Sequence, residues 1–253
     1  MKQSLSWWCF QNRGVDDETL LKEARNIGYE AVELINAEKF DLVADTGLSI
    51  AAHIGHSGMG DGLNNPKNHD FIEQEITANL ELATEYNIPN LIVFSGNRRP
   101  GLSGEQGAEY AAAGLRRVAK SAEDAGVCLI IELLNSKVDH HGYQADHTAW
   151  IASVIEAVGS PSVKILYDIY HAQIMEGDLI RTIQDNHKTI GHYHTAGNPG
   201  RQDLDNDQEI YYPSIVRAIA KTGYDGYIGH EFVPKGEPVA ALRAAYELTA
   251  GSL

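Results

Sequence analysis

Short runs of residues typical of β-strands recur along the whole chain and alternate with stretches of helical spacing. This repetition constrains the fold more than any other feature, because the number and order of repeated units decide the architecture. Eight such runs are present, at Leu5–Phe10, Glu30–Leu34, Ser49–Ile54, Asn90–Ser95, Cys128–Leu134, Val163–Ile169, Ile190–Thr195 and Tyr227–Val233.

The segments between these runs predict helices. Asp16–Ile27 opens with acidic residues, which favour the positive end of a helix dipole. His69–Tyr86 and Gly104–Ala125 place apolar residues three and four positions apart. Shorter or weaker helical patterns occur at Ala37–Thr46, Asp146–Val158, Leu179–His187, Tyr212–Thr222 and Pro238–Ala250. Eight strand–helix units predict an α/β protein, a single (β/α)8 TIM barrel, with residues 1–253 forming one domain.

An open, doubly wound sheet fits the pattern less well. Such sheets more often have five or six strands, and no GxGxxG motif follows the first run, so a dinucleotide site has no local support. The runs LIVF and CLII are continuously apolar, as expected for parallel strands buried on both faces.

The charge of the chain excludes several classes of protein. Its 20 Lys and Arg residues against 35 Asp and Glu residues give a formal net charge of −15, and no basic stripe is present, so we expect no nucleic-acid partner. No apolar stretch reaches the ~18–20 residues of a membrane span, and MKQSLSWWCF lacks the apolar segment of a secretory signal. We therefore expect a cytoplasmic protein that does not bind membranes. The sequence leaves open whether it forms a homo-oligomer.

Ionisable residues stand at the ends of four consecutive runs. In a (β/α)8 barrel the carboxyl ends of the strands build the active site. A carboxylate in an apolar strand costs several kcal/mol unless it is paired or bound to a cation, and CLIIELL and YIGHEFV contain no Lys or Arg. We predict one divalent metal ion at this mouth. Three carboxylates and one imidazole favour Mn²⁺ or Mg²⁺ and are compatible with Co²⁺ or Zn²⁺. The predicted ligands are Glu132, Asp168, His194 and Glu231.

The same segments resemble a known family. IIELLN, YDIYHAQ, GHYHTAGNPGR and GHEFVP are similar to the xylose isomerase-like sugar isomerases and epimerases, and most closely to the hydroxypyruvate isomerase branch. The resemblance covers nearly the whole chain, including GYEAVEL and LYDIYHAQIMEGD. It implies a (β/α)8 barrel, one divalent metal ion, and interconversion of an α-hydroxy aldehyde with an α-hydroxy ketone, as between hydroxypyruvate and tartronate semialdehyde.

Two positions depart from a uniform family pattern. Hydroxypyruvate isomerases often carry Gln where this chain has His194, whereas the ketose 3-epimerases of the superfamily carry His. In those epimerases an Arg follows this His by six positions, whereas Arg201 follows it by seven, in a PGR segment that resembles the hydroxypyruvate isomerase form.

The predicted chemistry is proton transfer next to a carbonyl group. A metal ion binds the carbonyl and hydroxyl oxygens and stabilises the enediolate. Glu132 and Glu231, on the fifth and eighth strands, are the predicted acid and base, and the sequence does not decide which is which. The substrate would be a small keto acid or ketose.

Five further residues are candidates for substrate binding. His171, expected in the loop after the sixth strand, would donate a hydrogen bond to a substrate oxygen or cap the following helix. Arg201 would bind a substrate carboxylate bidentately or remain a solvated loop residue. His53 at the end of the third strand, Asn97 after the fourth and Trp8 in the first would contact the substrate or serve only the fold.

Other functions use the same kind of site. A ketose 3-epimerase, or a hydratase or lyase of keto-sugars, would need the same metal and carboxylates. Apurinic endonucleases share the barrel but need a multi-zinc cluster and a basic surface, which the net charge of −15 opposes. A sugar- or metal-binding barrel without turnover is the non-enzymatic alternative. Gly58–Asn68, rich in glycine, would close the site as a lid or form a plain turn.

Overall fold

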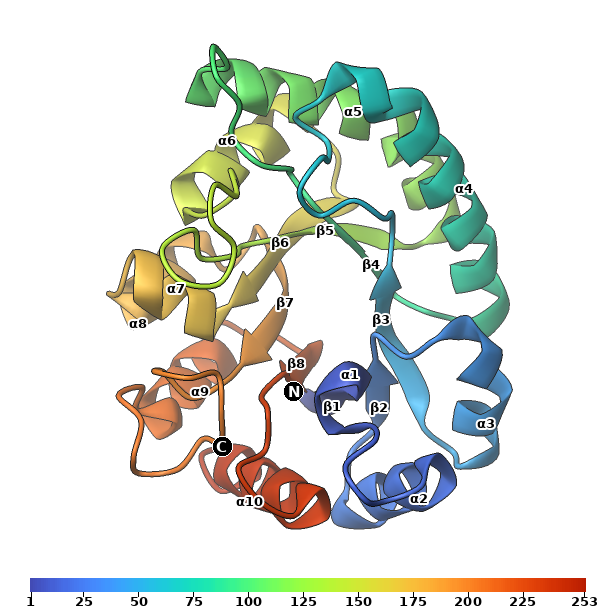
Figure 1. Cartoon of the computed structure of the whole chain (residues 1–253), viewed down its shortest axis with the longest axis vertical. Helices are drawn as coiled ribbons and strands as arrows, with labels where there is room; N and C mark the ends of the chain where they lie inside the picture. The colour runs from blue at the N-terminus through green and yellow to red at the C-terminus, as the bar shows by residue number, and fades with distance from the viewer.

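A closed barrel of eight parallel strands forms the centre of the molecule (Figure 1). The computed structural model describes all residues, 1–253. Each strand pairs with the next one in the sequence, and β1 pairs with β8, which closes the ring. The predicted (β/α)8 barrel is therefore confirmed. The strands β1 to β8 are Lys2–Ser6, Ala31–Glu33, Ser49–Ile54, Asn90–Val93, Cys128–Glu132, Val163–Asp168, Ile190–Thr195 and Tyr227–His230.

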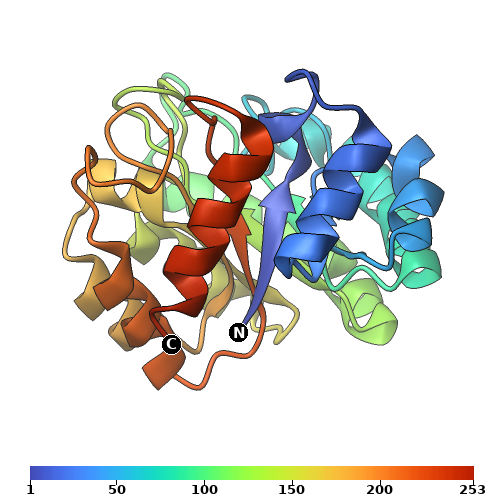
Figure 2. The same cartoon turned by 90° about the horizontal axis from the view of Figure 1, so that it is seen from below.

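The helices surround the barrel and cover its outer face. Figure 2 shows both chain termini at one end of the barrel, with β1 running away from them toward α1. No helix combines the length and apolar character needed to cross a bilayer. The helices α1 to α10 are Trp7–Phe10, Asp17–Ile27, Phe40–Asp45, His69–Tyr86, Gly104–Ala125, Thr148–Val158, Ile169–Met175, Leu179–Asn186, Tyr212–Lys221 and Pro238–Ala250, with short 3₁₀ turns at Ala37–Lys39 and Pro66–Asn68.

Side-chain caps explain where several helices begin. The Asp16 carboxylate accepts the N–H of Thr19 at the start of α2. Ser103 and Gln106 form a reciprocal capping box at the start of α5. The Asp168 carboxylate accepts the N–H of His171 and thereby begins α7 directly after β6.

Two sequence predictions about local structure are wrong. The run Leu5–Phe10 was expected to be one strand, but β1 ends at Ser6 and Trp7–Phe10 form a helical turn, because a short apolar run fits a buried helix as well as a strand. His171 was expected in a loop, but it lies in α7, since the Asp168 cap allows a helix to start without a connecting segment.

Polar side chains from β1, β2 and β7 meet inside the barrel. Alternation along β7 points His192 and His194 inward, where both rings reach the carboxylate of Glu33 from β2. Ser4 of β1 donates to the same carboxylate. This buried carboxylate lies below the carboxyl end of the barrel and fixes the orientation of the two histidine rings.

Candidate active site

Four side chains from neighbouring strands converge at the carboxyl end of the barrel. Glu132 ends β5, Asp168 ends β6, His194 lies in β7, and Glu231 follows β8. One ligand atom from each lies within 4.8 Å of the others, and all four residues are buried. The structure therefore brings together all four predicted metal ligands.

The donor atoms of this cluster fit a divalent cation. Nδ1 of His194 lies 3.0 Å from Oε2 of Glu231 and 3.5 Å from Oε1 of Glu132 without forming a hydrogen bond. Oδ2 of Asp168 is also buried and forms no hydrogen bond. Buried polar atoms rarely stay unpaired in proteins, so two such atoms within a carboxylate cluster are suited to holding a cation.

Burial and neighbouring charges shift the pKa values of the three carboxyl groups in different directions. Burial, opposed by His194 at Glu132 and by Arg201 at Asp168 and supported at both by the Glu231 carboxylate, raises the pKa of Glu132 to about 7 and that of Asp168 to about 6. Burial acts on Glu231 in the same direction, but the charges of His194 and Arg201 outweigh it and hold its pKa well below the ordinary value. A divalent cation would favour the charged form of all three carboxyl groups.

Glu231 is fixed by three donors. Its Oε1 accepts hydrogen bonds from Nε1 of Trp8, at 2.8 Å, and from Oγ of Ser6, at 3.2 Å. Its Oε2 lies 2.6 Å from Nη2 of Arg201. The Arg201 guanidinium lies over the rings of Trp8 and Tyr170, 5.2 and 5.7 Å from their centroids. The predicted residues Trp8 and Arg201 thus contact the cluster directly.

A cavity of about 400 Å³ opens on this cluster. Both Glu132 and Glu231 reach it, and most of the remaining wall is apolar. Its lining consists of Trp8, Leu34, Ile54, Met59, Phe94, Glu132, Leu134, His140, Arg201 and Glu231. A small molecule bound here would contact two carboxylates, one guanidinium and an apolar surface.

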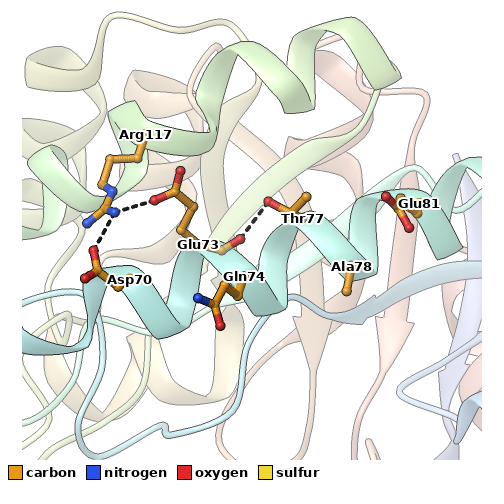
Figure 3. Close-up of a pocket in the computed structure, with 7 residues that line it drawn as sticks. All are labelled: Asp70, Glu73, Gln74, Thr77, Ala78, Glu81 and Arg117. Carbon is orange, nitrogen blue, oxygen red and sulfur yellow. Dashed lines mark hydrogen bonds and ion pairs between the residues drawn. The ribbon is translucent and has the colours of Figure 1, made fainter.

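A second depression lies away from the barrel mouth. It follows the outer surface of α4, where Arg117 of α5 pairs with Asp70, at 2.6 Å, and with Glu73 (Figure 3). None of the predicted site residues lines it, and its one cationic group, Arg117, is already paired with two carboxylates. The cavity at the barrel mouth is therefore the candidate active site.

His171 lies directly beside the cluster. Its ring is fully buried, and Nε2 lies 3.7 Å from Oδ2 of Asp168. The ring packs edge-on against His140, with centroids 5.3 Å apart. Burial, and then the charge of Arg201, lower the pKa of His171 well below the ordinary value.

Three of the five predicted substrate contacts do not line the cavity: His171, which lies against Asp168 of the cluster, and His53 and Asn97. The ring of His53 packs against Phe40 of α3 at 5.2 Å, because its neighbour Ile54 takes the position that faces the cavity. Asn97 lies in the segment after β4, where its carbonyl accepts a hydrogen bond from Asn64. Neither residue lines the cavity.

Sequence reasoning missed three residues around the site. Oε2 of Glu33 lies 2.8 Å from Nε2 of His192 and 3.2 Å from Nε2 of His194, so it fixes the ring that presents Nδ1 to the cluster. A glutamate inside the apolar run EAVEL was the available signal for Glu33, and spacing by two from His194 was the signal for His192. His140, which lines the cavity, lies in a loop whose path has no sequence signature.

The glycine-rich segment after β3 divides into two parts. Met59 lines the cavity. The N–H groups of Leu63 and Asn64 donate to the carbonyls of Phe94 and Ser95, at 3.1 and 2.7 Å, at the end of β4. The second part is therefore fastened to the barrel, which limits any lid to the residues around Met59.

The chain is similar over most of its length to proteins named as isomerases. It is 25% identical over 244 residues to a putative hydroxypyruvate isomerase of Drosophila melanogaster, covering 92% of each chain. It is 30% identical over 178 residues to the hydroxypyruvate isomerase of Escherichia coli K12, covering 70% of this chain and 68% of that protein. It is 30% identical over 173 residues to a 2-oxo-tetronate isomerase of Pectobacterium atrosepticum, covering 68% and 65%.

Solved structures share the fold. A structure described as AP endonuclease, family 2, from Brucella melitensis superposes with a TM-score of 0.85 at 23% identity, covering 96% of this chain and 97% of that one. A D-psicose 3-epimerase from Clostridium cellulolyticum H10, solved with D-tagatose, gives 0.82 at 17% identity, covering 100% and 99%. The family described as xylose isomerase-like TIM barrel matches residues 21–250. The chain belongs to this xylose isomerase-like TIM barrel family.

Proposed function

We propose that the protein is a divalent-metal-dependent isomerase that interconverts an α-hydroxy ketone and an α-hydroxy aldehyde, of the hydroxypyruvate and tartronate semialdehyde type. The observation that carries this proposal is that Glu132 and Glu231 belong to one four-residue cluster and face the same cavity. The relatives named hydroxypyruvate isomerase support the choice of reaction.

Glu132, Asp168, His194 and Glu231 are the proposed metal ligands. The two unpaired buried atoms among them, and a set of three carboxylates and one imidazole, favour Mn²⁺ or Mg²⁺ and are compatible with Co²⁺ or Zn²⁺. When bound, such a cation polarises the substrate carbonyl and stabilises negative charge on its oxygens.

The two glutamates differ in how readily they carry a proton. Glu132 has no Lys or Arg partner, so of the two carboxyl groups it is the one that takes up a proton more readily beside the cation. Trp8 and Arg201 hold Glu231 in the charged form. We assign Glu231 to remove the proton from carbon and Glu132 to deliver one to the neighbouring carbon, with the roles exchanged in the reverse reaction.

Arg201 and Trp8 are the proposed substrate contacts beside the glutamates. Nε of Arg201 is buried and has no hydrogen-bond partner, so its N–H is free for a substrate carboxylate or hydroxyl group. The Trp8 ring, which lines the cavity, offers an apolar face to C–H groups. His53 and Asn97 do not line the cavity, and we leave them out of the proposed site.

A proton NMR assay in D₂O tests the function. We expect the Mg²⁺-loaded protein to interconvert hydroxypyruvate and tartronate semialdehyde, with deuterium entering at the carbon that receives the proton. EDTA should abolish the reaction, and added Mg²⁺ or Mn²⁺ should restore it. A metal-loaded protein that leaves both compounds unchanged would refute this substrate assignment, and a fully active metal-free protein would refute the cofactor.

A ketose 3-epimerase is the second candidate. His194 favours it, and the largely apolar cavity of about 400 Å³ has room for more than three carbons. The same two glutamates would then act on opposite faces of one carbon. In the same assay, inversion of D-tagatose at C3 without conversion of hydroxypyruvate would select this function. The cytoplasmic location expected from the sequence stays a prediction.

A further inference from the structure

The loop that follows β5 holds the side-chain amide of Asn135 in one orientation. Its Oδ1 accepts the backbone N–H groups of Val138, at 2.9 Å, and Asp139, at 3.0 Å. Two N–H donors require an oxygen at this end of the amide, so the other end is the NH₂ group. The orientation of Asn135 therefore follows from the backbone of its own loop.

The NH₂ group of Asn135 donates in two directions. Nδ2 lies 2.7 Å from Oδ2 of Asp139 and 2.6 Å from Nδ1 of His171. Tyr170 donates to the same Asp139 oxygen at 2.8 Å, which keeps that acceptor in place. Because an amide NH₂ can only donate, Nδ1 of His171 must accept and carries no hydrogen. With Nδ1 unprotonated, Nε2 is the ring nitrogen that carries the hydrogen.

This Nε2–H group has no acceptor within the protein. The His171 side chain is fully buried, and its Nε2 forms no hydrogen bond. It lies beside Oδ2 of Asp168, at 3.7 Å, and Asp168 belongs to the cluster whose Glu132 and Glu231 line the cavity. An unpaired buried donor destabilises the protein, and that cost is recovered when a ligand brings an acceptor. A substrate carbonyl or hydroxyl oxygen would be such an acceptor.

We propose that Asn135 is a positioning residue that holds His171 in the tautomer protonated at Nε2, so that His171 donates a hydrogen bond to a substrate oxygen and does not act as a base. This proposal rests on the proposed function for the identity of the acceptor. The tautomer itself depends only on the hydrogen bonds of Asn135, and the two parts can be tested separately.

The experiment compares the wild type with Asn135→Asp. The aspartate keeps an oxygen for the Val138 and Asp139 N–H groups but replaces the NH₂ donor with a second acceptor, which draws a proton to Nδ1 of His171. Long-range ¹H–¹⁵N NMR of the Mg²⁺-loaded, histidine-labelled protein distinguishes the tautomers, with His171 assigned from the spectrum of His171→Gln. We expect an unprotonated Nδ1 and a protonated Nε2 in the wild type, and a protonated Nδ1 in Asn135→Asp.

Asn90→Asp is the matched control. Asn90 is also buried and its NH₂ group donates to the Ala51 carbonyl at 2.9 Å, but it begins β4, at the opposite end of the barrel. This variant should lose stability in a similar way and leave the His171 signals and kcat unchanged. Asn135→Asp should lower kcat about 10²-fold with a smaller change in KM.

The outcomes separate this proposal from the proposed function. A wild-type His171 protonated at Nδ1 would overturn the role of Asn135, whether or not the variant folds, and so would unchanged His171 signals in a folded Asn135→Asp. A wild type with the expected tautomer but without isomerase activity would refute the proposed function and leave the positioning role of Asn135 standing.

Discussion

Glu132 and Glu231 belong to one cluster but differ in their partners. Glu231 accepts hydrogen bonds from Trp8, Ser6 and Arg201, whereas Glu132 has only the imidazole of His194 beside it. The surrounding donors thus hold the charge of Glu231 more firmly than that of Glu132, which suits the two carboxyl groups to different steps of a proton transfer.

Replacing either carboxylate should stop turnover. We expect Glu132→Gln and Glu231→Gln each to lower kcat by at least ~10²-fold, because an amide cannot exchange the proton, while the circular dichroism spectrum stays that of a folded barrel. Glu156→Gln, on the exposed face of α6, is the matched control and should behave as the wild type. Near-normal turnover in both active-site variants would contradict the assigned roles.

Glu33 should act through His194 on the metal. Because a carboxylate partner fixes the ring and raises the basicity of its free nitrogen, Glu33→Gln should weaken metal binding about 10–100-fold. Isothermal titration of the metal-free protein with Mn²⁺ measures this directly, with Glu156→Gln again as control. An unchanged dissociation constant would show that Glu33 serves only the barrel core.

At the scale of elements, the order of strands and helices was predictable because each buried strand leaves a local apolar signature. Glu132 and Asp168 were predictable as residues of the barrel mouth because each ends a strand. The helical turn at Trp7–Phe10 and the immediate start of α7 were not predictable, since tertiary burial and a cap decide them. His140 and Asn135 required the path of a loop, which depends on contacts distant in sequence.

The close packing of the segment after β3 against the end of β4 can be tested by substitution of Gly62. A Cβ atom on Gly62 would lie 2.4 Å from the Phe94 carbonyl and 2.8 Å from the Gly96 nitrogen, both backbone atoms that cannot move aside. Gly62→Ala should therefore lower the free energy of unfolding in urea by about 1–3 kcal/mol. Gly104→Ala, where a Cβ meets nothing within 4 Å, should stay within about 0.5 kcal/mol of the wild type. If Gly62→Ala is as stable as the wild type, the segment is not fastened to β4.

At the scale of the whole molecule, metal binding and stability are linked through pH. Burial raises the pKa of Glu132 to about 7 and that of Asp168 to about 6, above their values in an unfolded chain. Proton uptake therefore favours the folded metal-free protein at low pH, and this stabilisation is lost as the pH rises through about 6 to 7. A cation replaces the protons, so it should stabilise the protein most where the protons have left.

We expect saturating Mn²⁺ to raise Tm more at pH 8 than at pH 5.5, as measured by differential scanning fluorimetry. The double variant Glu132→Gln, Asp168→Asn, which removes both titrating carboxyl groups, should show little metal-induced shift at either pH. Equal shifts of the wild type at the two pH values would mean that the cation binds elsewhere.

An anomalous difference map, recorded at the manganese absorption edge from crystals grown with Mn²⁺, locates the bound metal ion directly. We predict one strong peak per chain at the barrel mouth, within bonding distance of carboxylate oxygens of Glu132, Asp168 and Glu231 and of Nδ1 of His194. A map without a peak there, or with the peak between Glu33 and His192 deeper in the barrel, would contradict the proposed metal centre and the chemistry assigned to it.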